Sequence, residues 1–171
     1  MSEIMMSGVL PRLILDGHKT QTRRAGKRWE SLKVGDVLHV REAWARVNGE
    51  LIFRADDRSV HTPIWTPAVH MPLELCRCRI RVTGARREVL GNISEADAVA
   101  EGFRAMKTRD LLMSFSGGKV LKMLGETDWL QAVQWWGEAS ARDRFLLFAR
   151  LLMGEEALGQ ECTVIEFEVV Q

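Results

Sequence analysis

The sequence of 171 residues contains no tyrosine, only four prolines and only three cysteines. An odd number of cysteines, with no secretory leader ahead of them, argues against a disulfide framework, so we expect a reduced, cytoplasmic protein. No apolar run approaches the length that crosses a membrane, so no membrane partner is expected. The four histidines do not stand at ligand spacing from the cysteines, and we therefore predict no metal site.

Charge of one sign is also scarce, because the formal net charge is only +1. This excludes a protein drawn to nucleic acid by its global charge alone. The basic residues nevertheless concentrate in 17–28 and 77–87, and beyond Arg150 the chain has five glutamates and no lysine or arginine. With 46% hydrophobic residues, the whole chain, residues 1–171, suits a single globular domain that carries a local basic patch.

The most informative segment is 17–24, with the sequence GHKTQTRR. It follows an apolar run at 9–15 whose spacing suits one buried helix face, and Gly17 stands where a left-handed helix cap falls. An amine, two threonine hydroxyls and two guanidinium groups then follow within six residues. So dense a group of cations after a helix end predicts a site for an anionic or nucleotide-like ligand. A solvated basic loop is the structural alternative.

Lys19 and Thr22 are three positions apart, so a single turn of backbone would place both side chains on one side. A threonine hydroxyl is a poor nucleophile until a base takes its proton, and lysine is a base only when it is neutral. Nearby cations and partial burial lower a lysine pKa toward that state. Because lysine–hydroxyl pairs replace the Ser-His-Asp arrangement in other enzymes, we interpret this pair as a candidate base and nucleophile.

Turn and strand signals continue along the chain. Residues 33–36 predict a turn and 37–41 the strand that follows it. Asn48 and Gly49 predict a tight hairpin. Residues 55–69, which are polar and contain proline, predict a long loop.

Residues 76–82 alternate between apolar and basic side chains. This period of two predicts a half-buried strand with Cys76 and Cys78 on its inner face. The outer face carries Arg77, Arg79 and Arg81. Such a row suits a phosphate backbone, although an ordinary solvated face is an equally good interpretation.

Helix signals dominate the second half of the chain. Ser94 is a candidate N-cap for a helix over 94–103, and Ser140 for another in which Phe145, Phe148, Ala149 and Leu152 form an apolar stripe. Residues 108–138 predict further helix, with a break at Gly117 and Gly118. A strand is predicted over 163–169. The order of helix, strands, helices and strand indicates an α+β fold.

The segment 17–24 resembles the G-x-K-T-x-T-x-R signature of ASCH domains, a branch of the PUA-like superfamily. Four further segments are similar to phage and prophage members of that family, in the same order along the chain: 35–44, 65–72, 93–102 and 164–167. The resemblance implies a small twisted β-barrel flanked by helices, with a helical insertion at about 104–138. It also implies a cleft that takes RNA or a nucleoside.

Some small bacterial ASCH proteins are amidohydrolases that remove the acetyl group from N4-acetylcytidine. Their catalytic residues, carried over position by position, fall on Lys19, Thr22 and Glu101, and the signature arginine falls on Arg24. In the implied mechanism Thr22 attacks the acetyl carbonyl and Lys19 takes and returns the proton. Glu101 orients Lys19 or protonates the leaving amine, and Arg24 stabilises the oxyanion or the base. The mechanism requires neither a metal nor an organic cofactor. These amidohydrolases are shorter than this chain and have no counterpart of 104–138.

Four further side chains are candidate substrate contacts, each with a structural alternative. Arg23 binds phosphate or holds the basic loop to a carboxylate. Trp65 stacks on a base from the loop before Pro67, or packs internally. His70 contacts the substrate or is a packed structural residue. Arg77 belongs to the predicted row of arginines.

Two other functions remain open at this point. The first is a non-catalytic RNA-binding module that uses the row of arginines and the loop 17–28 as an electrostatic groove. The second is a ribonuclease that acts on single-stranded RNA. The sequence does not indicate an oligomeric state.

Overall fold

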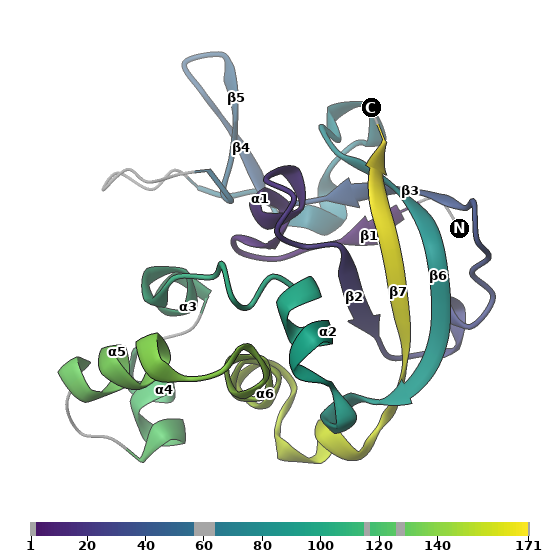
Figure 1. Ribbon diagram of the computed structural model, residues 1–171. Coiled ribbons are helices and arrows are strands. Elements are labelled where there is room, and N and C mark those ends of the chain that lie inside the picture. Colours follow the sequence, from purple (N-terminus) through teal and green to yellow (C-terminus); the bar gives the residue numbers. More distant parts are fainter. Residues whose placement is uncertain (1–2, 57–63, 115–116, 126–128, 171) are drawn as a thin grey trace.

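A twisted five-stranded sheet forms the centre of the molecule, and helices gather along one side of it (Figure 1). The computed structural model describes residues 3–56, 64–114, 117–125 and 129–170. The strand order is β1-β3-β6-β7-β2, and of these pairs only β1 with β3 is parallel. The strands are β1 (Glu3–Met5), β2 (Gln21–Arg24), β3 (Val37–Arg41), β6 (Arg79–Val89) and β7 (Glu161–Val170). The predicted α+β class is confirmed, but within the described residues the sheet is open, with β1 and β2 at its two ends, where a closed barrel was expected.

The two long strands β6 and β7 separate two apolar cores. Successive side chains of a strand point to opposite faces, and β7 contributes to both cores accordingly. Val164 packs with the helices, whereas Ile165 and Phe167 pack with the apolar side chains of β3 and β6. The sheet therefore has a buried face on each side, and the catalytic candidates of β2 lie at its edge beside β7.

The N-terminal third follows its sequence signals closely. Helix α1 (Leu10–Leu15) ends before Gly17, whose φ of +74° is the left-handed conformation predicted for the cap. The predicted hairpin joins β4 (Trp44–Val47) to β5 (Glu50–Phe53), with positive φ at Asn48 and Gly49. This two-stranded ribbon projects from the body of the molecule (Figure 1). Both predictions are confirmed.

Six α-helices are described. After α1, they are α2 (Glu95–Ala100), α3 (Thr108–Ser114), α4 (Gly117–Leu124), α5 (Trp129–Glu138) and α6 (Ala141–Met153). The hydroxyls of Ser94 and Ser140 accept the backbone N–H groups of Asp97 and Asp143, as predicted for N-caps. None of the described helices is long and apolar enough to cross a membrane.

Short 3-10 turns connect the longer elements. They are η1 (Lys27–Trp29), η2 (Ala68–His70), η3 (Leu73–Leu75), η4 (Leu90–Asn92) and η5 (Glu155–Gly159). Of the long loop predicted over 55–69, residues 57–63 lie outside the described part of the chain.

Several predicted boundaries are wrong for local reasons. The strand expected from residue 76 begins at Arg79, because Cys76 still closes the turn η3 through its N–H to the Leu73 carbonyl at 3.1 Å. Cys76 is consequently only half-buried, while Cys78 is buried as expected. The helix expected to run to residue 103 stops at Ala100, because Gly102 adopts a φ of +93°.

Two expectations for the later helices are also wrong. Gly117 and Gly118 form the first turn of α4 rather than a break. Leu152, expected in the apolar stripe of α6, is 56% exposed, whereas its neighbour Leu151 in the same last turn is fully buried. The other members of that stripe, Phe145, Phe148 and Ala149, are buried.

Candidate functional site

The backbone brings Lys19 and Glu101 together from segments that are distant in sequence. The N–H groups of His18 and Lys19 both donate to the Leu13 carbonyl, at 2.8 and 2.9 Å, which turns the chain directly after α1. The next N–H, of Thr20, donates to Ala100 O at 2.8 Å and so fixes this turn against the end of α2. Glu101, the residue that caps α2, is thereby placed beside Lys19.

Gly102 makes this approach possible. A Cβ atom at this position would lie 3.0 Å from Leu13 Cδ1 and 3.3 Å from Lys19 Cβ. Its φ of +93° is also a conformation that side-chain-bearing residues rarely adopt. Both constraints select glycine here.

The Lys19 side chain is buried, with 1% of its surface exposed, and its ammonium group is fully partnered. Nζ donates to Glu101 Oε2 at 2.5 Å, to Gln21 O at 2.8 Å and to Glu101 O at 3.1 Å. An ammonium group has three N–H donors, so these contacts use all of them. Lys19 in this state is held rigidly and carries no free donor.

Arg23 holds the other oxygen of the same carboxylate. Its Nη1 lies 3.4 Å from Glu101 Oε1, while Nη2 pairs with Glu88 at 2.8 Å and with Asp97 at 3.1 Å. The Arg23 side chain is only 1% exposed. Of the two roles that the sequence left open, these contacts favour holding the loop to carboxylates over binding phosphate.

Burial sets the proton affinity of the site. Loss of water around Lys19 lowers its pKa below the usual lysine range, and the charges of Arg24 and Arg23 act in the same direction. The neighbouring carboxylate of Glu101 opposes this shift but does not overcome it. Burial likewise lowers the pKa of Arg24. The Lys19 amine therefore becomes neutral at a lower pH than an exposed lysine.

A cavity of about 530 Å³ opens onto this cluster. Thr22, on β2, lines it together with Lys19, Arg24 and Glu101. Lys19 precedes the strand, so the two side chains reach one cavity from a loop and a strand rather than from the single turn that we predicted. Within the described part of the chain, the Thr22 hydroxyl has no hydrogen-bond partner. It is therefore available to a ligand.

The remaining walls of the cavity are largely apolar. They include Trp29, Phe103, Phe145, Phe148, Leu152 and Met153. The sequence assigned the stripe of α6 to the core, since core and cavity stripes have the same helical spacing. The structure distinguishes a cavity wall from a core because Leu152, at the end of the stripe, is exposed and lines the cavity. Flat aromatic walls around a few polar groups suit a planar base or an acyl group.

Arg24 lies at the edge of the cavity with spare hydrogen-bonding capacity. Its Nη2 donates to Met5 O at 2.6 Å, and its guanidinium lies 5.9 Å from the centre of the Trp29 ring. The buried Nε has no partner among the described residues. A ligand oxygen or ring nitrogen in the cavity would satisfy it.

Three candidate substrate contacts do not line this cavity. Trp65 and His70 are absent from its lining; of their segment, only Ala68 of the turn η2 lines the cavity. The Arg77 guanidinium instead pairs with both oxygens of buried Glu42, at 2.8 and 3.0 Å, and with Asp56. Because β6 begins after Arg77, the predicted row of three arginines is reduced to Arg79 and Arg81.

Metal-ligating side chains do not cluster anywhere in the described ranges, where no group of three or more His, Cys, Asp or Glu could hold an ion. The main cavity is lined by an amine, a hydroxyl, a carboxylate and several guanidinium groups, including those of Lys19, Thr22, Glu101 and Arg24.

No protein-family model matches the sequence, and no curated protein matches it. Two solved structures are partly similar. The ASCH domain from Lactobacillus crispatus JV V101 has 18% identity and a TM-score of 0.38, over 94% of this chain and 70% of that one. A protein from Enterococcus faecalis V583 has 18% identity and a TM-score of 0.44, over 99% of this chain and 80% of that one. At these values the likenesses decide neither the family nor the function of this chain.

Proposed function

We propose that this protein is an ASCH-type amidohydrolase that removes the acetyl group from N4-acetylcytidine, either free or within RNA. The observation that carries the proposal is the convergence of Lys19, Thr22, Arg24 and Glu101 on one cavity with aromatic walls. These are the four positions onto which the sequence resemblance maps the catalytic and oxyanion groups. A planar acetylated base fits such walls, and because the walls are largely apolar the ligand need not be charged.

In this mechanism, Lys19 acts from its neutral form, which its lowered pKa makes accessible, and Glu101 orients the amine through their short hydrogen bond. The neutral amine then takes the proton of Thr22 as the threonine oxygen bonds to the acetyl carbon. Arg24 stabilises the negative charge that develops on the carbonyl oxygen. Return of the Lys19 proton to the exocyclic nitrogen breaks the C–N bond and releases cytidine. Lys19 then takes a proton from water as the water oxygen bonds to the acetyl carbon. Lys19 returns that proton to Thr22 Oγ as the ester C–O bond breaks, which releases acetic acid (acetate after ionisation) and regenerates the Thr22 hydroxyl and the neutral amine.

The ligand-free geometry places a condition on this mechanism. Because all three Lys19 N–H groups are donated to fixed acceptors, the lone pair reaches Thr22 only if one of these contacts is given up. Substrate binding must therefore shift Lys19 Nζ away from Gln21 O or Glu101 O.

The test is loss of the acetylated chromophore when purified protein is incubated with N4-acetylcytidine. Thr22→Val keeps the shape of the side chain and should lower kcat by at least about 10³-fold, as expected for removal of a nucleophile. Lys19→Met should have a comparable effect. Thr20→Val is the matched control, because Thr20 belongs to the same motif but is exposed, and it should retain wild-type turnover.

Two results would contradict the proposal. Absence of turnover by folded wild-type protein would exclude the amidohydrolase and favour one of the RNA-directed alternatives. Full activity of Thr22→Val would exclude threonine as the nucleophile.

A further inference from the structure

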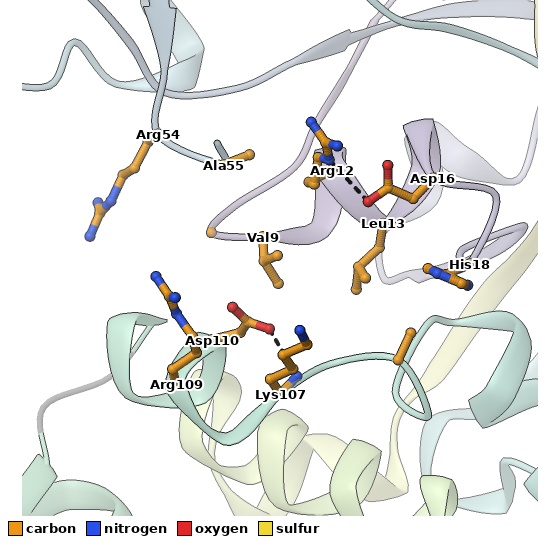
Figure 2. A pocket seen from close by; sticks show the side chains of 12 residues that line it. Val9, Arg12, Leu13, Asp16, His18, Arg54, Ala55, Lys107, Arg109 and Asp110 are labelled. Carbon is orange, nitrogen blue, oxygen red and sulfur yellow. Dashed lines mark hydrogen bonds and ion pairs between the residues drawn. The ribbon is translucent and has the colours of Figure 1, made fainter. Parts of the chain in front are cut away.

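A second, smaller pocket lies beside the main cavity. Its volume is about 220 Å³, and it is formed by α1, the residues after β5 and the segment that leads into α3. Figure 2 shows Arg54 and Arg109 extending toward one another from facing segments, with Lys107 on the same side as Arg109. Three cations thus converge from two segments that are more than fifty positions apart in the sequence.

The acidic side chains of this pocket are already engaged. Asp16 accepts Nε of Arg12 at 3.0 Å, and Asp110 accepts the backbone N–H of Lys107 at 2.8 Å. By contrast, the side chains of Lys107 and Arg109 have no hydrogen-bond or ion-pair partner in the described ranges. Like charges that face one another repel, so an anion between Arg54 and Arg109 would be stabilised by both.

The pocket and the main cavity are neighbours, lined by different residues of the same segments. Leu10 of α1 lines the main cavity, while Val9 and Leu13 line the pocket. The consecutive residues His18 and Lys19 are likewise divided, with His18 on the pocket and Lys19 on the main cavity. An anion held in the pocket would therefore lie across α1 and residues 18–19 from a base in the main cavity.

We propose that this pocket binds a backbone phosphate of the polynucleotide whose acetylated cytosine occupies the main cavity. A phosphodiester carries one negative charge, and guanidinium and ammonium groups are its usual partners in proteins. The inference rests on the function proposed above and names its substrate class, an oligonucleotide rather than a free nucleoside. Arg54, Lys107 and Arg109 then select substrates by their backbone, not by their base.

The experiment compares two substrates with two double variants. The substrates are N4-acetylcytidine and a short single-stranded oligoribonucleotide with one acetylated cytidine. Lys107→Ala/Arg109→Ala should raise KM for the oligonucleotide about tenfold, because two charged contacts are lost, and leave kcat/KM for the nucleoside unchanged. Lys33→Ala/Arg46→Ala removes the same charges from exposed positions elsewhere and should change neither.

Other outcomes would overturn the assignment. An unchanged KM for the oligonucleotide, or equal losses on both substrates, would show that the pocket does not bind the substrate backbone. If wild-type protein hydrolyses neither substrate, the proposed function fails, and fluorescence anisotropy with an unmodified labelled oligoribonucleotide tests the pocket separately. If Lys107→Ala/Arg109→Ala binds the oligoribonucleotide more weakly and Lys33→Ala/Arg46→Ala does not, the pocket is a site for the nucleic-acid backbone. If the pocket binds inorganic phosphate but the protein does not bind the oligonucleotide, the pocket is a site for a free anion, and the proposal is overturned.

Discussion

The two cavities on either side of α1 are lined by similar cations, but these cations differ in their access to water. In the main cavity Lys19 and Arg23 are buried, and each is paired with the Glu101 carboxylate. In the pocket Lys107 and Arg109 are exposed. Burial changes the proton affinity of a lysine, whereas exposure preserves its charge. The comparison teaches that solvent access, more than residue type, sets the charge state of these cations and so the role that we propose for each cavity.

The largest expected effect comes from breaking the buried cluster. Glu101→Gln removes the only carboxylate that pairs with Lys19 in the described structure, and leaving a buried charge without its partner costs about 3–5 kcal/mol. The matched change at the pocket is Asp16→Asn, in a pair whose side chains are 44% and 38% exposed, which should cost less than about 1 kcal/mol. Urea unfolding of both variants measures the difference. Equal losses would mean that the two clusters do not differ in the way described.

The second prediction concerns pH. Burial lowers the pKa of Lys19 from the ordinary value of 10.5. Because only the neutral amine accepts the Thr22 proton, kcat/KM for N4-acetylcytidine should rise about tenfold per pH unit while Lys19 is mostly protonated. It should reach its plateau at a pH below 10.5. The unfolded chain binds the Lys19 proton more tightly than the folded one, so stability should also rise with pH between the two pKa values. A pH–rate profile that falls over this range would argue against a lysine base.

A third prediction tests the packing of Gly102 against Leu13 of the pocket and Lys19 of the main cavity. Gly102→Ala adds a Cβ atom 3.0 Å from Leu13 Cδ1, and together with the positive φ it should lower the free energy of unfolding by about 2–3 kcal/mol. Gly35→Ala is the control, because its φ of +95° is nearly the same but nothing lies within 4 Å. It should cost only about 1 kcal/mol. Thermal unfolding distinguishes them, and equal shifts would show that the close contact is unimportant.

The smallest expected effect is that of salt. If the pocket holds one or two phosphates, KM for an acetylated oligonucleotide should rise about threefold to sevenfold between 50 and 200 mM salt. KM for the uncharged nucleoside should remain nearly constant. Parallel measurements on the two substrates give the answer, and identical salt responses would remove the electrostatic distinction between the cavities.

Local signals predicted much of this structure. The caps at Ser94 and Ser140 and the turn at Asn48 and Gly49 depend on neighbouring residues, and each occurs where it was predicted. The convergence of Lys19 with Thr22 was also predicted, although through a different local geometry.

Long-range partners were not predictable in the same way. Arg77 looked like one of three surface arginines, yet its partners Glu42 and Asp56 are 35 and 21 positions away. Nothing in the local pattern of Arg77 specifies them. The wall contributed by α6 was missed for a related reason, because an apolar stripe does not reveal whether it packs against other side chains or borders an empty space.

The position of β2 in the sheet has a consequence for how the protein is made. Within the described sheet, β2 pairs with β7, which follows every described helix in the chain. Lys19 and Glu101, for their part, are 82 positions apart. Contacts between such distant segments form late in folding because a long loop must close first. A ribosome stalled before residue 161, where β7 starts, would hold a chain that contains Lys19, Thr22, Arg24 and Glu101 but lacks the strand that orders them. The arrangement of these four side chains is therefore reached only after β7 has been synthesised and has paired with β2.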